Sequence, residues 1–93
     1  MNVMPVDQLI IEVTKICKKN GVKRLDLFGS FATGTATPTS DIDFVVYGCD
    51  DIMQLEYDLS TIDTLRKIDI FDHDEIHNKY LLGDIEKYGK QIY

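Results

Sequence analysis

The chain has 93 residues and a mass of 10.7 kDa, which predicts one compact domain over residues 1–93 and leaves no room for a second. Apolar residues make up 44% of the chain and charged residues 28%, a balance typical of soluble globular proteins that excludes a disordered tail or a fibrous repeat. Sixteen acidic residues against ten basic ones give a net charge of -6, which argues against binding to a nucleic-acid template, because that requires clustered lysine and arginine.

The first predicted element is a helix over residues 5–20. Its apolar residues recur at three- and four-residue steps and form one face: Val6, Leu9, Ile10, Val13, Ile16 and Cys17. Pro5 suits the first turn of a helix, and the pair Asn20-Gly21 predicts where the helix ends.

A strand follows at 24–28, where leucines alternate with polar side chains. Five further segments then alternate along the chain: a polar loop at 29–40, a strand at 41–47, a helix from the Asp50-Asp51 cap to about Leu65, a strand at 67–71 and a helix at 76–88. This order predicts an α+β (layered α/β) domain, with a small three- or four-stranded mixed sheet and helices packed on one face.

The two cysteines, Cys17 and Cys49, have neither a metal-ligand nor a CxxC spacing. They are expected as free thiols in a reducing compartment, with a single disulfide left open as the alternative. The first twenty residues are charged and contain no long apolar run, so we expect no signal peptide, no membrane association and a cytoplasmic location.

Two acids open the predicted strand at 41–47. Residues two apart on a strand point the same way, so Asp41 and Asp43 should leave one face, while Ile42, Phe44 and Val46 form the core on the other. Two neighbouring carboxylates repel each other, and a divalent cation between them would remove that cost. The alternative is a pair of solvated acids on an open sheet face.

Three further features favour a functional site over solvated acids. Asp69 repeats the outward pattern on the next strand, and three carboxylates would suit Mg²⁺ or Mn²⁺ better than zinc. Gly29 allows a close backbone approach, so the amides after it and the Ser30 hydroxyl could bind phosphate. Ser40 can hold its loop through a local hydrogen bond. A phosphate cradle beside acids indicates transfer of part of a nucleoside triphosphate.

The two segments 29–34 (GSFATG) and 40–44 (SDIDF) together resemble the signature of the polymerase-β-like nucleotidyltransferase superfamily. In its shortness the chain is similar to the minimal nucleotidyltransferases of bacteria and archaea, and the resemblance covers nearly all of it. It implies that Gly29, Ser30 and Ser40 bind the nucleotide. It also implies that the catalytic acids Asp41, Asp43 and Asp69 hold two Mg²⁺ ions, with Mn²⁺ possible. Asp72 is the other candidate for the third acid.

The resemblance implies an Mg²⁺-dependent enzyme that moves a nucleoside monophosphate, AMP from ATP being the first expectation, to an acceptor hydroxyl and releases pyrophosphate. ATP or another NTP is thus an expected partner. A small helical HEPN-type protein or a substrate-binding subunit is the expected acceptor, as in toxin–antitoxin pairs in which the antitoxin modifies a tyrosine of its toxin. The alternatives are adenylylation of a small molecule, a silent nucleotide-binding or partner-binding subunit, and a structural protein with incidental acids. A homo-oligomer also stays open.

Other polar residues are expected to have plainer roles. Asp26 is predicted to be a solvated acid on the first strand, with a position facing the site as the alternative. Arg66 and Lys67 are predicted to balance nearby acids, with contact to phosphate as the alternative. His73 is expected at the surface or as a cap. Tyr80 is predicted to face inward from the last helix.

Overall fold

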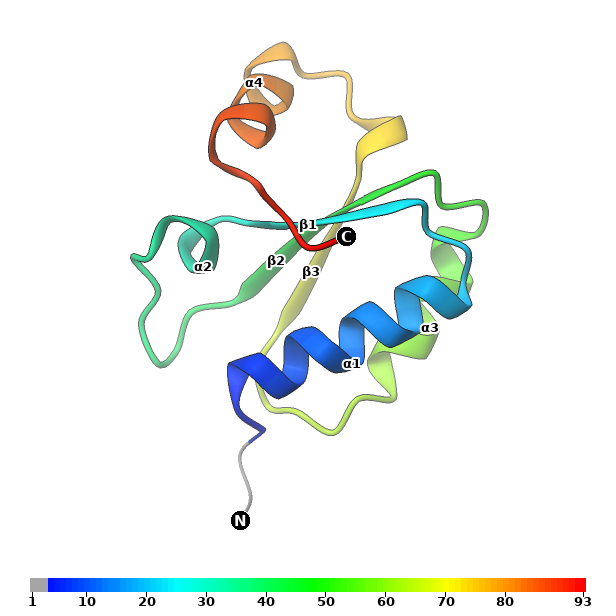
Figure 1. The fold of residues 1–93 in the computed structure, drawn as a ribbon, viewed down its shortest axis with the longest axis vertical. Helices are drawn as coiled ribbons and strands as arrows, with labels where there is room; N and C mark the ends of the chain where they lie inside the picture. The colour runs from blue at the N-terminus through cyan, green and yellow to red at the C-terminus, as the bar shows by residue number, and fades with distance from the viewer. Residues whose placement is uncertain (1–3) are drawn as a thin grey trace.

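The computed structural model describes residues 4–93 (Figure 1). Its elements are α1 (Val6–Lys19), β1 (Arg24–Phe28), α2 (Ser30–Thr33), β2 (Ile42–Tyr47), α3 (Ile52–Ser60), β3 (Ile68–Asp72), the 3₁₀ turn η1 (His73–Glu75), α4 (Lys79–Tyr88) and β4 (Lys90–Gln91). Within this part of the chain, every helix is too short or too polar to cross a membrane.

Helix α1 forms where the periodicity predicts it. Leu9, Val13 and Cys17, at four-residue steps, are fully buried. The helix ends at Asn20, whose side-chain amide donates to the Ile16 carbonyl at 2.9 Å and to Asp58 of α3 at 2.9 Å. Its cap therefore also joins α1 to α3.

The sheet is mixed, with the strand order β3-β2-β1-β4. Strand β1 pairs antiparallel with β2 and β4, whereas β2 and β3 are parallel. Parallel neighbours need a crossover connection, and α3 supplies it. The predicted α+β class with a small mixed sheet is confirmed.

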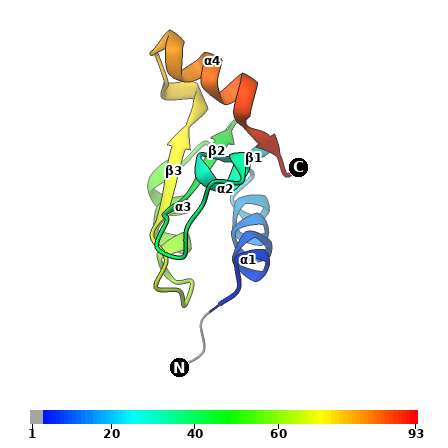
Figure 2. The same ribbon diagram turned by 90° about the vertical axis from the view of Figure 1, so that its left-hand side faces the viewer.

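The two faces of the sheet carry different helices. Ile42, Phe44 and Val46 are fully buried and pack in one core with α1 and α3, which lie side by side (Figures 1 and 2). Helix α4 stands at the other end of the molecule and, through Ile85, lines a hollow with Arg24 of the opposite sheet face. The expected single-face packing therefore applies to α1 and α3 but not to α4.

Capping side chains explain where two helices depart from their predicted bounds. Helix α3 ends at Ser60, where the Thr61 hydroxyl donates to the Asp58 carbonyl at 2.7 Å, and Leu65 beyond it is 85% exposed. Helix α4 begins at Lys79 because Asn78 caps it. Tyr80 is 87% exposed, so the inward orientation predicted for it is wrong.

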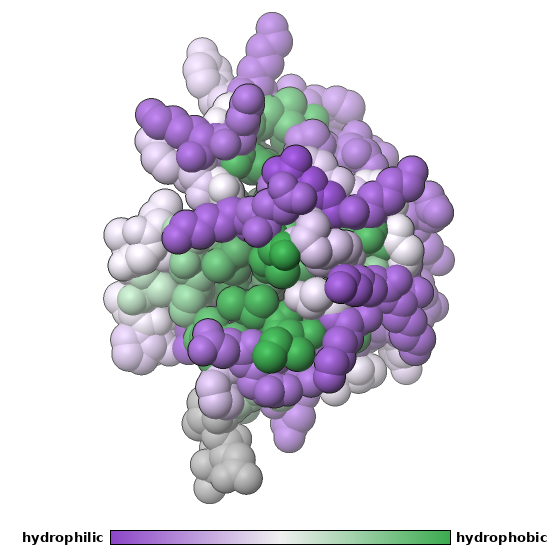
Figure 3. All heavy atoms as spheres, viewed as in Figure 1, coloured by the Kyte–Doolittle hydropathy of each residue, from purple (hydrophilic) through white to green (hydrophobic). Residues whose placement is uncertain are grey.

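The last four residues complete the sheet. Strand β4 pairs with β1, and the next residue, Ile92, donates its backbone N–H to the Leu25 carbonyl at 2.7 Å. The Tyr93 hydroxyl donates to the Val22 carbonyl at 2.8 Å, and burial raises its pKa to about 12. Hydrophobic side chains gather between this segment and α1, with hydrophilic ones around them (Figure 3).

Both cysteines are free thiols, as expected, so the alternative of a disulfide is not realised in this structure. Cys17 is fully buried in α1, and burial raises the pKa of its thiol to about 12. Cys49 lies half-buried after β2.

Candidate functional site

The sheet register brings two of the three predicted acids together. Asp43 on β2 is the direct Cα partner of Asp69 on β3, so their backbones lie about 4.8 Å apart across the parallel ladder. Both side chains leave the face opposite the core, and both residues are half-buried. Asp41 lies one residue before β2 and is exposed.

The electrostatics of this pair are those of two carboxylates that repel. The pKa of Asp43 is raised above its usual value, first by burial, then by the charge of Asp69 and the hydrogen bond with it, and less strongly by the charge of Asp41. Lys67 opposes this shift, and its ammonium nitrogen lies 3.6 Å from Asp69 Oδ1. Lys67 thus balances an acid, as predicted.

The three acids do not form a ready-made metal cage. Across residues 4–93, no three acidic, histidine or cysteine side chains are gathered closely enough to hold an ion by themselves. The donor set nevertheless fits Mg²⁺ or Mn²⁺, because carboxylate oxygens are their preferred protein ligands. Asp72, the other candidate for the third acid, pairs with Val46 and caps η1, so Asp69 is the acid beside Asp43.

Gly29 holds the turn before α2 directly against Asp43. Its φ of 68° and ψ of -151° are a conformation that L side chains rarely adopt. A Cβ added there would lie 2.2 Å from Asp43 Oδ2. The carbonyl of Gly29 accepts from the Ala32 and Thr33 amides, whereas the Ser30 and Phe31 amides make no backbone hydrogen bond to any described residue. The predicted phosphate cradle therefore adjoins the acid pair.

The loop that leads to Asp41 is held by two side chains. The Ser40 hydroxyl accepts from the Thr37 amide at 2.8 Å, which is the local hydrogen bond predicted for it. Arg66 donates from a terminal guanidinium nitrogen to the Ser40 carbonyl at 2.5 Å, and its guanidinium lies 4.9 Å from the centre of the Phe31 ring. Among residues 4–93 Arg66 forms no ion pair, so the prediction that it balances acids is wrong.

Asp26 is also not the solvated acid that was predicted. It is 1% exposed and accepts hydrogen bonds from Arg24 Nε at 3.0 Å and from the Tyr47 hydroxyl at 2.8 Å. Burial and this hydrogen bond raise the pKa of Tyr47 to about 12. His73 stacks on the Tyr47 ring, with centroids 4.2 Å apart. The missed signal was an opposite charge two residues from Asp26, which places Arg24 on the same strand face.

This network makes a testable contribution to stability. Arg24→Gln should lower the free energy of unfolding by about 2–3 kcal/mol, because a buried carboxylate loses its cation, while Tyr47→Phe should cost about 1 kcal/mol for one hydrogen bond. Urea denaturation at neutral pH measures both. The matched control is Lys15→Gln, which breaks an exposed pair with Glu12 (3.6 Å) and should cost less than about 0.5 kcal/mol. Equal losses in Arg24→Gln and Lys15→Gln would contradict the assigned role.

Comparisons with known proteins agree on one family. The profile of the family described as "Polymerase beta, Nucleotidyltransferase" matches residues 12–93. The chain is 30% identical over 79 residues to "Putative protein adenylyltransferase" of Methanocaldococcus jannaschii, covering 80% of this chain and 84% of the relative.

Solved structures are also similar. A chain of a toxin–antitoxin crystal structure with AMP-PNP shares 25% identity at a TM-score of 0.70, over 89% of this chain and 71% of that one. A chain of the toxin–antitoxin MntA-HpeT, in a variant with a Tyr-to-Ala substitution, shares 26% identity at a TM-score of 0.65, over 97% of this chain and 72% of that one.

Proposed function

Because the chain belongs to the polymerase beta nucleotidyltransferase family, we propose that it transfers AMP from ATP to a hydroxyl group of a partner protein and releases pyrophosphate. The observation that carries this proposal is the direct contact between the Gly29 turn and Asp43, itself paired with Asp69. That contact joins an anion-binding turn to acids that bind cations, and a nucleoside triphosphate with its counterions needs both.

In this proposal the turn binds the triphosphate. The backbone amides of Ser30 and Phe31, which have no backbone partner in the described chain, donate to phosphate oxygens, together with the Ser30 hydroxyl. Ser40 keeps its loop folded beside the nucleotide through the hydrogen bond from Thr37. The absence of a side chain on Gly29 lets this backbone lie against the acids.

Asp41, Asp43 and Asp69 would hold two divalent cations, Mg²⁺ or Mn²⁺. Bound there, the ions would neutralise the triphosphate and acidify the acceptor hydroxyl. The raised pKa of Asp43 supports this role, since it reports a crowded set of carboxylates that a cation would stabilise.

The reaction itself breaks one bond and forms another. The acceptor oxygen attacks the α-phosphorus, the bond from that phosphorus to the oxygen bridging the α- and β-phosphates breaks, and pyrophosphate leaves. The proton of the acceptor hydroxyl passes to the Asp69 carboxylate. Asp69 is only half-buried, so the acceptor can approach this carboxylate.

The partner is proposed from the relatives. One similar structure is described as a toxin–antitoxin with AMP-PNP, and another as the pair MntA-HpeT. We therefore infer ATP as the donor and a small helical toxin, of the HEPN type that the sequence resemblance implies, as the acceptor. In this pair the present chain would be the antitoxin.

The test uses ATP labelled in turn at the α- and γ-phosphate. With Mg²⁺ and the product of a neighbouring gene, the α-label should appear on that partner, the γ-label should not, and EDTA should abolish labelling. Label from the γ-position would mean phosphoryl transfer instead. No label from either position, with a partner that binds the chain, would contradict the proposal.

A second candidate function is a silent subunit that binds nucleotide without turnover. One observation favours it: Asp41 is exposed, and among residues 4–93 it does not gather with two other acids into a group that could hold an ion. Binding of Mg²⁺-ATP with no release of pyrophosphate, in the presence of the partner, would favour this reading.

A further inference from the structure

Arg66 connects three segments that the proposed function assigns to the site. It lies two residues before β3, the strand that carries Asp69, and its side chain reaches the loop before β2 and the helix α2. Strand β3 carries a catalytic acid, the loop before β2 carries the residue that precedes Asp41, and helix α2 carries the residue that follows Ser30.

Arg66 is held in place through both its backbone and its side chain. Its backbone amide donates to the Thr64 hydroxyl at 3.1 Å, which fixes the chain on the way into β3. Its guanidinium donates to the Ser40 carbonyl and covers the Phe31 ring. Close by, the Ile42 amide donates to the Lys67 carbonyl at 3.0 Å, so the starts of β2 and β3 are tied together beside the same contacts.

Arginine suits this position because its planar cation can stack on an aromatic ring and donate a hydrogen bond in its own plane at the same time. With no ion pair in the described chain, its charge is directed to a carbonyl and a ring, and a charged donor makes the stronger hydrogen bond. A lysine would keep the charge and lose the stacked plane.

We propose that Arg66 is a positioning residue. Through its contacts with Ser40 and Phe31, it fixes the positions of the neighbouring residues Asp41 and Ser30 relative to Asp69. The proposal rests on the proposed function for the roles of those three residues. In this proposal Arg66 acts through its contacts with Ser40 and Phe31. Its loss would leave more molecules with Asp41 misplaced, so the reaction slows while the partner still binds.

The test compares Arg66→Gln with the wild-type chain. Transfer of α-labelled AMP should show a fall in kcat of about tenfold or more, with the KM for the partner unchanged, because the loss of one charged hydrogen bond loosens the loop. Arg66→Lys should recover part of the loss. In a chain that already carries Phe31→Leu, adding Arg66→Gln should lower kcat by a smaller factor than it does in the wild-type chain, because the two residues act through one contact.

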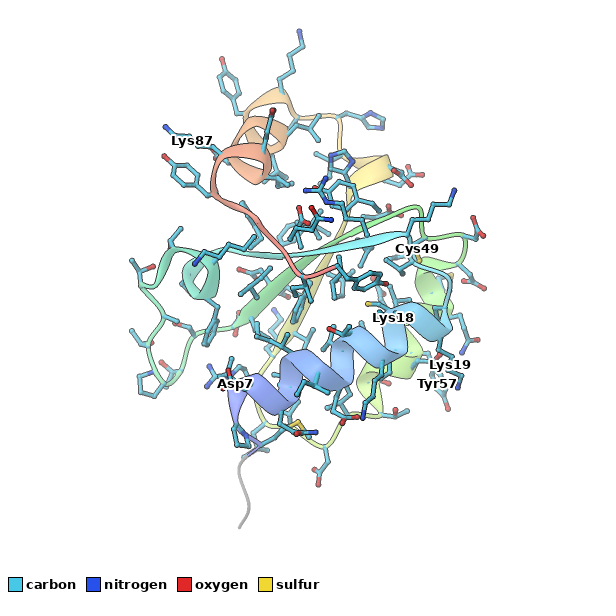
Figure 4. The ribbon with its side chains drawn as sticks, in the orientation of Figure 1. Asp7, Lys18, Lys19, Cys49, Tyr57 and Lys87 are labelled. Carbon is cyan, nitrogen blue, oxygen red and sulfur yellow. The ribbon has the colours of Figure 1, made fainter. Side chains whose placement is uncertain are left out.

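Lys18→Gln is the matched control. Lys18 on α1 also places a cation over an aromatic ring, 5.0 Å from the centre of Tyr93, and lies far from α2 (Figure 4). This variant should leave kcat unchanged. If Arg66→Gln lowers the melting temperature as Lys18→Gln does but transfers AMP at the wild-type rate, Arg66 is only structural and the proposal is overturned.

Hydrogen exchange separates this proposal from the proposed function. Without nucleotide, the Ile42 amide should exchange about tenfold faster in Arg66→Gln and Arg66→Lys should be intermediate. If the wild-type chain transfers nothing, the proposed function fails, and the exchange result still decides whether Arg66 ties these segments together. Unchanged exchange in both variants would overturn that tie.

Discussion

Replacing Asp43 with asparagine is expected to abolish AMP transfer and to make the folded chain more stable at neutral pH. Transfer should fall by a factor of about 10³ or more, because under the proposed function the acids would hold cations that contribute several kcal/mol to the reaction. Stability should rise because the substitution removes a carboxylate that burial and the Asp69 charge disfavour.

The gain in stability should depend on pH in one direction. The folded-state pKa of Asp43 is raised above the value of 3.8, so the native state binds this proton more tightly than the unfolded state. The stability associated with the protonated carboxyl is present below pH 3.8 and is lost as the pH rises through the folded-state pKa. Asp43→Asn should therefore be more stable than the wild-type chain at pH 7 and no more stable than it at pH 3.

Thermal melting at both pH values, with and without Mg²⁺, measures this prediction. At pH 7 Mg²⁺ should raise the melting temperature of the wild-type chain and leave that of Asp43→Asn nearly unchanged. Asp69→Asn is the companion variant, because it removes the other member of the pair. An Asp43→Asn chain that transfers AMP at the wild-type rate would exclude Asp43 as a ligand of the cations that the reaction needs.

Replacing Gly29 with alanine should both destabilise the chain and stop transfer. The backbone angles of Gly29 cost an L residue about 1–3 kcal/mol. The added methyl group would also meet Asp43 Oδ2 at 2.2 Å, so either the turn or the carboxylate must move. We expect a loss of about 3 kcal/mol in the free energy of unfolding and at least a hundredfold slower transfer, because both parts of the site are displaced.

Gly21→Ala is the control for backbone strain alone. Gly21 also has a positive φ, of 75°, but an added Cβ would meet no atom within 4 Å. This variant should lose about 1 kcal/mol and transfer AMP normally. Urea denaturation and AMP labelling, run on both variants, make the comparison. Similar behaviour of the two variants would mean that the Gly29 turn does not need its contact with Asp43.

Features that depend on neighbours in the chain could be predicted from the amino-acid sequence. The bounds of α1 and β1 follow from helical periodicity, the Asn20-Gly21 stop and strand alternation. The same alternation predicted that Ile42, Phe44 and Val46 are buried and that Asp43 faces away from them. The contact between Asp43 and Asp69 needed one further assumption, that their strands are neighbours, and this is correct.

Features that depend on residues far away in the chain could not be predicted from the amino-acid sequence. Asp26 is buried because Tyr47, twenty-one residues later, hydrogen-bonds to it, and Arg66 turns from nearby acids to a carbonyl twenty-six residues earlier. Likewise β4 exists because β1 offers an unpaired edge. Periodicity tells which way a side chain points, but the energy of a buried charge or a strand edge depends on which group folding brings against it.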